Sequence, residues 1–164
     1  ADILTGNAGA DTFQFDYQES SQGIPKISDF AKNGDQDILK FINSEVVGQA
    51  DNTPMVETVN LSTGGIKLIN ADTQVLVFLS GDGFTSNAEF QAALNGSHGL
   101  STTRSQLDEF IGLWTSSTSG SANVSSIMFV EETKTYSTSK NFIELLDFSE
   151  INLVALTSDN FVFA

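Results

Sequence analysis

The sequence contains no cysteine among its 164 residues, which excludes disulfide bonds, thiolate metal sites and cysteine nucleophiles. It contains one histidine, His98, which lies in the glycine-containing run Asn95–Gly99, and it has no His-Glu-x-x-His zinc signature. No apolar run reaches the roughly 18 residues that a membrane-spanning helix requires. These absences exclude a thiol enzyme and a zinc protease of that type, and they predict no transmembrane segment.

Basic residues are scarce as well. Seven Lys and Arg residues stand against 21 Asp and Glu residues, which gives a formal net charge of −14. This charge argues against binding to nucleic acid or to anionic membrane surfaces, and it favours association with divalent cations. The adjacent acidic pairs Asp108-Glu109 and Glu131-Glu132 diverge on either a strand or a helix, so neither resembles a glycosidase dyad. We therefore predict that the chain is not itself an enzyme.

An Asp followed two residues later by a large apolar residue occurs twice near the start, at a spacing of nine residues. The two pairs are Asp2 with Leu4 and Asp11 with Phe13. This is the spacing of a calcium-binding nonapeptide repeat, Gly-Gly-x-Gly-x-Asp-x-U-x, in which U is a large apolar residue. Gly6 and Gly9 occupy two of the glycine positions, and Asn7, which also tolerates positive φ, replaces the third. The pattern predicts loops that turn backbone carbonyls and an Asp carboxylate toward a hard cation.

Four blocks of the sequence carry a resemblance to a known family. They are Gly9–Phe15, Ile27–Phe30, Gly34–Leu39 and the C-terminal run Leu156–Ala164. The chain resembles the end of a repeats-in-toxin (RTX) protein, a calcium-dependent family that bacteria export by type I secretion. The resemblance implies Ca²⁺ as the cofactor, further RTX repeats upstream, and the type I secretion apparatus as a partner during export. Residues 43–140 carry no resemblance.

In the β-roll of this family two nonapeptides form one turn of the coil, so loops on the same side recur about every 18 residues. Counting from Asp11 leads to Asp29, and we expect these carboxylates to share one calcium ion. The expected ligands are Asp11, Asp29, the backbone carbonyls of Gly6 and Ala8, and Asp35 or Asp37, with Asp2 in a second site that needs an upstream loop. Sites of this kind bind calcium with a Kd of about 10⁻⁴–10⁻³ M. An ordinary turn between strands is the alternative interpretation.

Dense strand and turn patterns predict an all-β fold, a β-roll end followed by a β-sandwich or roll cap, with about two inserted α-helices. We expect residues 1–42 to form the end of the calcium-binding β-roll and its capping strands. Residues 43–164 should form a mostly β C-terminal domain with helices near residues 86–94 and 103–115. Such a domain would cover the exposed sheet edge of the roll, which otherwise invites aggregation.

Local signals support these elements. Ser86 followed by Glu89 forms a capping box at the start of the first helix. In the second helix, apolar residues recur at i, i+3, i+4 and i+7, as on an amphipathic face, at Leu107, Phe110, Ile111 and Trp114. Gly64-Gly65 predicts a hairpin between Thr58–Leu61 and Ile66–Ile69, and Ile151–Leu156 reads as a strand.

The end of the chain predicts an export signal. From residue 141 onward there is no Lys or Arg, and acidic residues interrupt apolar runs. We expect a secretion signal at about residues 141–164, whose final residues include Asp159, Phe161, Val162 and Phe163. Because Phe161–Phe163 would promote aggregation if it stayed exposed, we expect it to pair as a last strand after export.

The leading interpretation is a calcium-binding C-terminal module of a larger secreted RTX-type protein, located outside the cell or on its surface. Such a module caps the β-roll, couples folding to extracellular calcium and carries the type I secretion signal. One alternative is the terminal domain of a surface-layer protein or adhesin, in which residues 43–140 bind a protein partner or the cell surface. Another is the accessory module of a secreted protease, lipase or epimerase.

Overall fold

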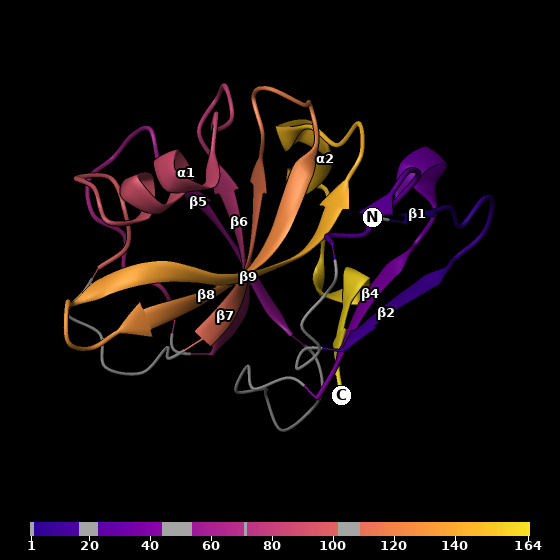
Figure 1. Cartoon of the computed structure of the whole chain (residues 1–164), viewed down its shortest axis with the longest axis horizontal. Coiled ribbons are helices and arrows are strands. Elements are labelled where there is room, and N and C mark those ends of the chain that lie inside the picture. Colours follow the sequence, from indigo (N-terminus) through magenta and orange to yellow (C-terminus); the bar gives the residue numbers. More distant parts are fainter. Residues whose placement is uncertain (1, 17–22, 44–53, 71, 102–108) are drawn as a thin grey trace.

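The computed structural model describes residues 2–16, 23–43, 54–70, 72–101 and 109–164, and these fold into two β-sheets and two short α-helices (Figure 1). The larger sheet contains seven strands, which in spatial order are β1 (Ile3–Leu4), β3 (Lys26–Ile27), β9 (Thr135–Leu145), β8 (Ala122–Val130), β7 (Glu109–Thr115), β6 (Thr73–Leu79) and β5 (Met55–Asn60). The smaller sheet contains β10 (Phe161–Phe163), β4 (Ile38–Ile42) and β2 (Thr12–Asp16). The helices are α1 (Asn87–Leu94) and α2 (Glu150–Val154), and 3₁₀ turns cover Lys32–Gly34 and Ser158–Asn160. The predicted all-β class with two inserted helices is confirmed.

The first four strands wind through both sheets as two turns of a parallel coil. β1 and β3 lie side by side in the larger sheet, β2 and β4 lie side by side in the smaller sheet, and both pairs are parallel. Ile3 is the partner of Lys26, and Thr12 is the partner of Ile38. One turn is therefore longer than the expected spacing of about 18 residues. Part of the difference arises because the connection 28–37 is longer than the connection 5–11.

Both faces of the larger sheet pack against other parts of the chain. One face packs against the smaller sheet, in a cluster that includes Val75, Leu113, Val124 and Ile143 from the larger sheet and Phe13, Leu39, Phe41 and Phe161 from the smaller one. The other face packs against α1, in a cluster that includes Leu76, Phe78, Phe90, Leu94, Phe110 and Trp114. The coil and the rest of the chain thus share one continuous apolar core through the first cluster.

The helix predicted at residues 103–115 is wrong where the structure describes it. Glu109–Thr115 is strand β7, and residues 102–108, including Leu107 of the predicted stripe, lie outside the described residues. β7 lies between β6 and β8 in the sheet, so its two faces are both buried and its apolar residues are nearly continuous. Such a run also places apolar residues at helical spacing, which is why the periodicity favoured the wrong element.

Two further local predictions are wrong. β5 pairs in parallel with β6 instead of forming a hairpin with Ile66–Ile69, where Lys67 makes an isolated bridge to Leu100. The second helix is α2, which overlaps the segment Ile151–Leu156 expected to be a strand. Its N-terminus is satisfied locally, because Ser149 and Asn152 form a capping box.

The first predicted helix is confirmed as α1. Ser86 is its N-cap and accepts the backbone N–H of Glu89 at 3.2 Å. Glu89 in turn accepts the hydroxyl and the backbone N–H of Thr85. These two bonds, the hydroxyl first, lower the pKa of Glu89 from its ordinary value of 4.5.

An amide ladder, made by Gln91 on α1 and by Asn95 at the C-cap of that helix, covers part of the free edge of β9. β3 pairs with only the C-terminal end of β9, at Glu144 and Leu145, so the N-terminal part of β9 lacks a strand partner from β3. There, Asn95 donates to the carbonyl of Tyr136 at 2.8 Å and accepts its N–H at 2.7 Å, as a neighbouring strand would. Gln91 accepts the hydroxyl of Thr138 at 3.1 Å. Covering an edge in this way blocks pairing with other chains.

We expect Asn95→Ala to lower the free energy of unfolding by about 1–2 kcal/mol, because two hydrogen bonds to the backbone of β9 are lost. The variant should also aggregate more readily, since the edge of β9 is uncovered. Urea unfolding and light scattering measure the two effects. Ser97→Ala, on the exposed loop that follows α1, is the matched control and should change neither. Equal behaviour of the two variants would show that the ladder does not protect the edge.

Candidate functional site

The connection 28–37 of the second coil turn lies against the connection 5–11 of the first turn, and Asp29 joins the two by hydrogen bonds. The Asp29 carboxylate accepts the backbone N–H of Gly6 at 3.0 Å and that of Asn7 at 2.8 Å. The second connection therefore holds the first connection in place. The sequence prediction that Asp29 lies beside the first loop agrees with this geometry, but its neighbours are Gly6 and Asn7, and both of its oxygens accept N–H groups.

Asp37 makes the second carboxylate clamp. It is 2% exposed, and it accepts the N–H of Asp11 and the N–H of Ala31, each at 2.9 Å. Ala31 has a φ of 49°, a left-handed conformation that a residue with a side chain rarely adopts without support. The carbonyl of Asp37 accepts the amide of Asn160 at 2.8 Å. Asp37 thus connects both coil turns to the C-terminal segment.

Asp11 is different, because one of its carboxylate oxygens is unpaired. Its Oδ2 is buried and has no hydrogen-bond partner among the described residues. A Cβ at position 6 would lie 2.6 Å from this oxygen, so any residue other than glycine there would displace the Asp11 side chain. Asn7 and Gly9, with φ of 71° and 114°, give the loop the left-handed turns that the repeat pattern predicts. A buried unpaired carboxylate oxygen is costly unless a donor or a cation satisfies it.

Of the predicted calcium ligands, Asp11 has a buried carboxylate oxygen without a hydrogen-bond partner among the described residues. Within the part of the chain that the structure describes, no three His, Cys, Asp or Glu side chains gather into a group that could hold a metal ion. The oxygens of Asp29 and Asp37 already accept N–H groups, as described above. Asp2 is exposed, and its carbonyl accepts the N–H of Lys26. Asp35 is partly exposed, and its N–H donates to the carbonyl of Lys32. Asp11, with the carbonyls of Gly6 and Ala8, is the remaining predicted set.

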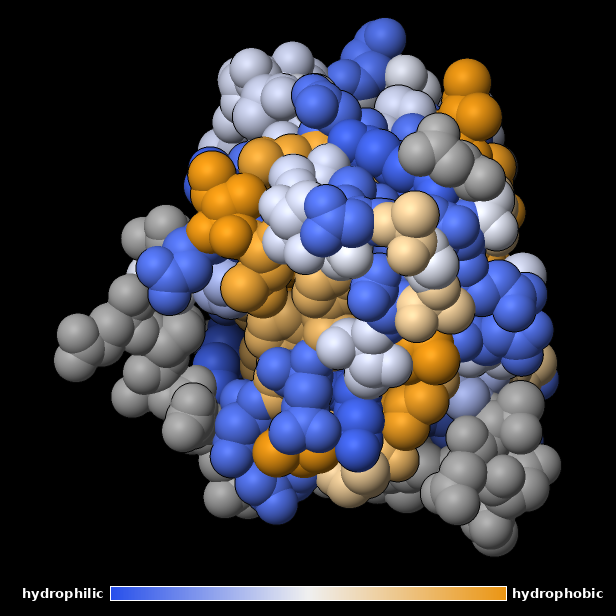
Figure 2. All heavy atoms as spheres, turned by 90° about the vertical axis from the view of Figure 1, so that its right-hand side faces the viewer, coloured by the Kyte–Doolittle hydropathy of each residue, from blue (hydrophilic) through white to orange (hydrophobic). Residues whose placement is uncertain are grey.

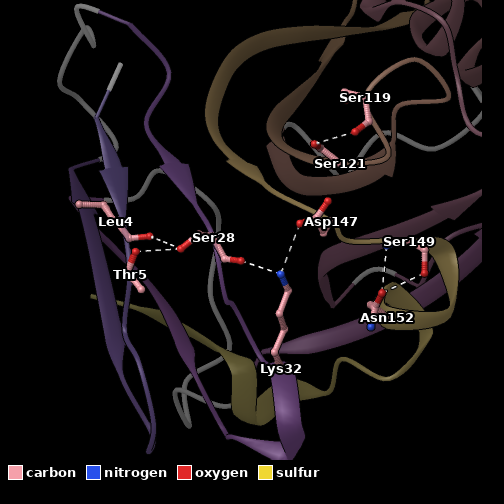
Figure 3. A network of polar contacts seen from close by, with 9 residues as sticks. All are labelled: Leu4, Thr5, Ser28, Lys32, Ser119, Ser121, Asp147, Ser149 and Asn152. Atoms are coloured by element: carbon pink, nitrogen blue, oxygen red, sulfur yellow. Dashed lines mark hydrogen bonds and ion pairs between the residues drawn. The ribbon is translucent and has the colours of Figure 1, made fainter.

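A polar network, which sequence reasoning missed, ties the coil to the rest of the fold (Figure 3). The hydroxyl of Ser28 lies 2.8 Å from that of Thr5 and donates to the carbonyl of Leu4 at 3.3 Å. Lys32 donates to the carbonyl of Ser28 at 2.6 Å, and its ammonium lies 3.9 Å from a carboxylate oxygen of Asp147. Isolated serines and lysines give no signal in the sequence, because their partners are far away along the chain.

The two coil turns have one closed side and one open side. β9 pairs in parallel with β3, and β10 pairs in parallel with β4, so later parts of the chain cover the second turn. β1 and β2 are the outermost strands of their sheets. Ile3 and Leu4 of β1 are 63% and 37% exposed. The space-filling view onto this side shows apolar residues among hydrophilic ones (Figure 2).

The predicted export residues belong to the folded structure. Phe161, Val162 and Phe163 form β10, which confirms that the end of the chain pairs as a last strand. Phe161 is buried in the core between the sheets, and Phe163 stacks on Phe41 with ring centroids 5.6 Å apart. Asp159 lies in the 3₁₀ turn just before this strand.

His98 and Trp114 both make contacts within the fold. His98 is exposed, and its Nδ1 accepts the N–H of Gly65 at 3.2 Å. Trp114 is 3% exposed, and its ring stacks on that of Phe90 with the centroids 4.8 Å apart, so it belongs to the core. No helix within the described ranges has the length and apolar character needed to cross a membrane.

Comparisons with protein-family profiles, curated proteins and solved structures give no match to this chain.

Proposed function

We propose that this chain is a calcium-binding module that ends the β-roll of a larger secreted RTX-type protein. The observation that carries the proposal is the buried, unpaired oxygen of Asp11, in a loop whose left-handed residues follow the nonapeptide pattern. A calcium ion at this oxygen would neutralise a charge that no described residue pairs. Carbonyls of Gly6 and Ala8 would supply the further hard oxygen ligands that calcium requires.

The arrangement of the strands supports the capping role. β9 and β10 occupy the far edges of the coil, and their presence prevents a third turn from stacking on that side. Among the described residues, the near edges, β1 and β2, have no partner strand on their outer sides, and both strands run parallel to the next turn, as another coil turn would need. A preceding turn of RTX repeats would pair with both edges and cover Ile3 and Leu4.

The same module would couple folding to export. An acidic chain with a net charge of −14 repels itself when unfolded, and a ligand that binds only the folded state shifts the equilibrium toward folding. Calcium is scarce inside cells and abundant outside, so folding would follow export. β10 is paired with β4 and its Phe161 is buried, so a secretion apparatus would read Asp159 and Phe161–Phe163 before the chain folds.

Unfolding with and without calcium, on the wild type and on Asp11→Asn, tests the proposal. With a Kd of about 10⁻⁴–10⁻³ M, about 10 mM calcium should stabilise the wild type by about 1.4–2.7 kcal/mol. In chelator, Asp11→Asn should not destabilise the protein, because it removes an unpaired buried charge and breaks no described side-chain bond. In calcium, the variant should fail to gain stability. Calorimetric titration of both proteins measures the binding directly.

Asp16→Asn, in β2 outside the loop, is the control and should keep the full calcium response. An unchanged calcium affinity in Asp11→Asn would exclude Asp11 as the ligand. A wild type that neither binds calcium nor gains stability from it would exclude the calcium-binding function and leave a metal-independent coil cap.

A further inference from the structure

Asn95, the C-cap residue of α1, is followed directly by Gly96. An asparagine side chain before glycine can react with its own backbone, because glycine lacks the Cβ that would hinder the approach of its nitrogen to the side-chain amide carbon. Both residues are exposed, so water and hydroxide reach them. The calcium proposal uses neither residue, so the chemistry of this pair is independent of calcium binding.

Hydrogen bonds restrain both reacting groups of this pair. The side-chain amide of Asn95 donates to the carbonyls of Tyr136 and Gln91, each at 2.8 Å, and accepts the N–H of Tyr136 at 2.7 Å. The backbone N–H of Gly96 donates to the carbonyl of Ala93 at 3.2 Å. Attack of the Gly96 nitrogen on Cγ of Asn95 requires that nitrogen to lose its proton and the side chain to leave β9. The reaction therefore needs local opening of the contact between α1 and β9.

We propose that Asn95 is a deamidation site whose reaction requires the contact between α1 and β9 to open, and whose product prevents that contact from forming again. In the first step the Gly96 nitrogen bonds to Cγ of Asn95, the bond from Cγ to Nδ2 breaks, and ammonia leaves with the proton of the Gly96 nitrogen. In the second step water opens the resulting succinimide at either carbonyl and gives aspartate or isoaspartate at position 95. The sequence of steps needs no oxidant or reductant, and water is the one reactant that the chain does not supply.

Neither product can rebuild the amide ladder. Aspartate has no side-chain N–H, so a carboxylate oxygen would face the carbonyls of Tyr136 and Gln91, to which the native side chain donates. Isoaspartate lengthens the backbone by one carbon and shortens the side chain, which displaces the acceptor from the N–H of Tyr136. Either product also places a negative charge at the C-terminus of α1, where the helix dipole disfavours it. Because the ladder covers the free edge of β9, deamidation leaves that edge open to pairing with other chains.

Incubation of the full chain in mildly alkaline buffer, with and without guanidinium chloride, followed by peptide mass spectrometry, measures where and how fast the chain deamidates. In denaturant Asn95 should react at a rate similar to that of Asn33, which precedes Gly34 in the other Asn-Gly pair of the sequence. In native buffer the rate at Asn95 should fall by at least about tenfold, because the reaction proceeds only from the open fraction.

Gly96→Ala separates the chemistry of the pair from the effect of the fold. A Cβ at position 96 would lie 3.4 Å from the carbonyl oxygen of Ala92, which is an ordinary contact, so the variant should keep the fold. In denaturant, deamidation of Asn95 in this variant should be at least about tenfold slower than in the wild type, because the added methyl group hinders the attacking nitrogen.

Asn95→Asp reproduces one product and tests its consequence directly. The amide hydrogen of Tyr136 should exchange with solvent at least about tenfold faster than in the wild type, and the variant should scatter more light on incubation. Ser97→Asp, which adds the same charge on the exposed loop that follows α1, is the matched control and should change neither. Equal rates at Asn95 in native buffer and in denaturant, no reaction at Asn95 in denaturant while Asn33 reacts, or equal behaviour of the two aspartate variants would each overturn the proposal.

Discussion

Asp37→Asn should lower the free energy of unfolding by about 2–4 kcal/mol, in chelator as well as in calcium. The native carboxylate accepts the N–H of Asp11 with one oxygen and the N–H of Ala31 with the other. Asparagine keeps one acceptor but turns an NH₂ group toward the second N–H, so one buried donor loses its partner. For a chain of this size the melting temperature should fall by about 5–15 °C. Thermal and urea unfolding in both conditions measure the change.

Asp35→Asn is the matched control for this experiment. It removes the same charge from the same connection, but the residue is partly exposed and its carboxylate takes no part in the clamp. Its stability should change by less than about 0.5 kcal/mol. If the two variants were equally stable, the bonds of Asp37 would contribute nothing beyond its charge.

The carboxylates of Asp37 and Asp11 differ in their hydrogen-bond partners, and we expect this difference to separate calcium-independent from calcium-dependent stability. Asp37 and Asp29 each bind two backbone N–H groups and need no metal for this, whereas Asp11 carries an unpaired oxygen. We therefore expect Asp37→Asn to destabilise the protein both in chelator and in calcium, and Asp11→Asn to be less stable than the wild type only in calcium. One chain would then contain both a metal-independent lock and a metal-dependent one, on neighbouring turns of the same coil.

Gly112→Ala should destabilise the protein by about 2–3 kcal/mol, although it adds only one methyl group. Gly112 lies in the middle of β7, and a Cβ there would lie 2.2 Å from Cδ1 of Ile127 and 3.1 Å from the ring of Phe78. Phe78 packs edge-on against Phe90 of α1 at 5.2 Å, so it cannot move without disturbing the helix. The measurement is urea unfolding of the variant against the wild type.

A double variant tests whether the clash with Ile127 is the cause. Ile127→Val removes the Cδ1 atom and alone should cost about 0.5–1.5 kcal/mol. In the Gly112→Ala background the same change should restore stability by about 1 kcal/mol, giving a coupling energy of opposite sign to the single losses. Additive losses in the double variant would contradict this account and place the strain at Phe78.

The sequence by itself determined the features that depend on neighbouring residues. The spacing of Asp and Gly gave the turn of the first loop, and the structure has positive φ at Asn7 and Gly9. Ser86 and Glu89 marked the start of α1, because an N-cap and its partner lie within one helical turn. The apolar end of the chain indicated a last strand, since Phe161–Phe163 could not remain exposed.

Only the tertiary structure decided the features that depend on distant partners. Phe110 and Trp114 fit a helical stripe, but β6 and β8 on either side make this segment a central strand. The coil turn is longer than the repeat spacing, so Asp29 meets Gly6 and Asp37 meets Asp11. Asp37 and Asn160 are 123 positions apart. Local patterns are set by the few residues within one turn of backbone, whereas strand pairing and buried polar bonds are chosen by whichever distant groups satisfy them in the folded core.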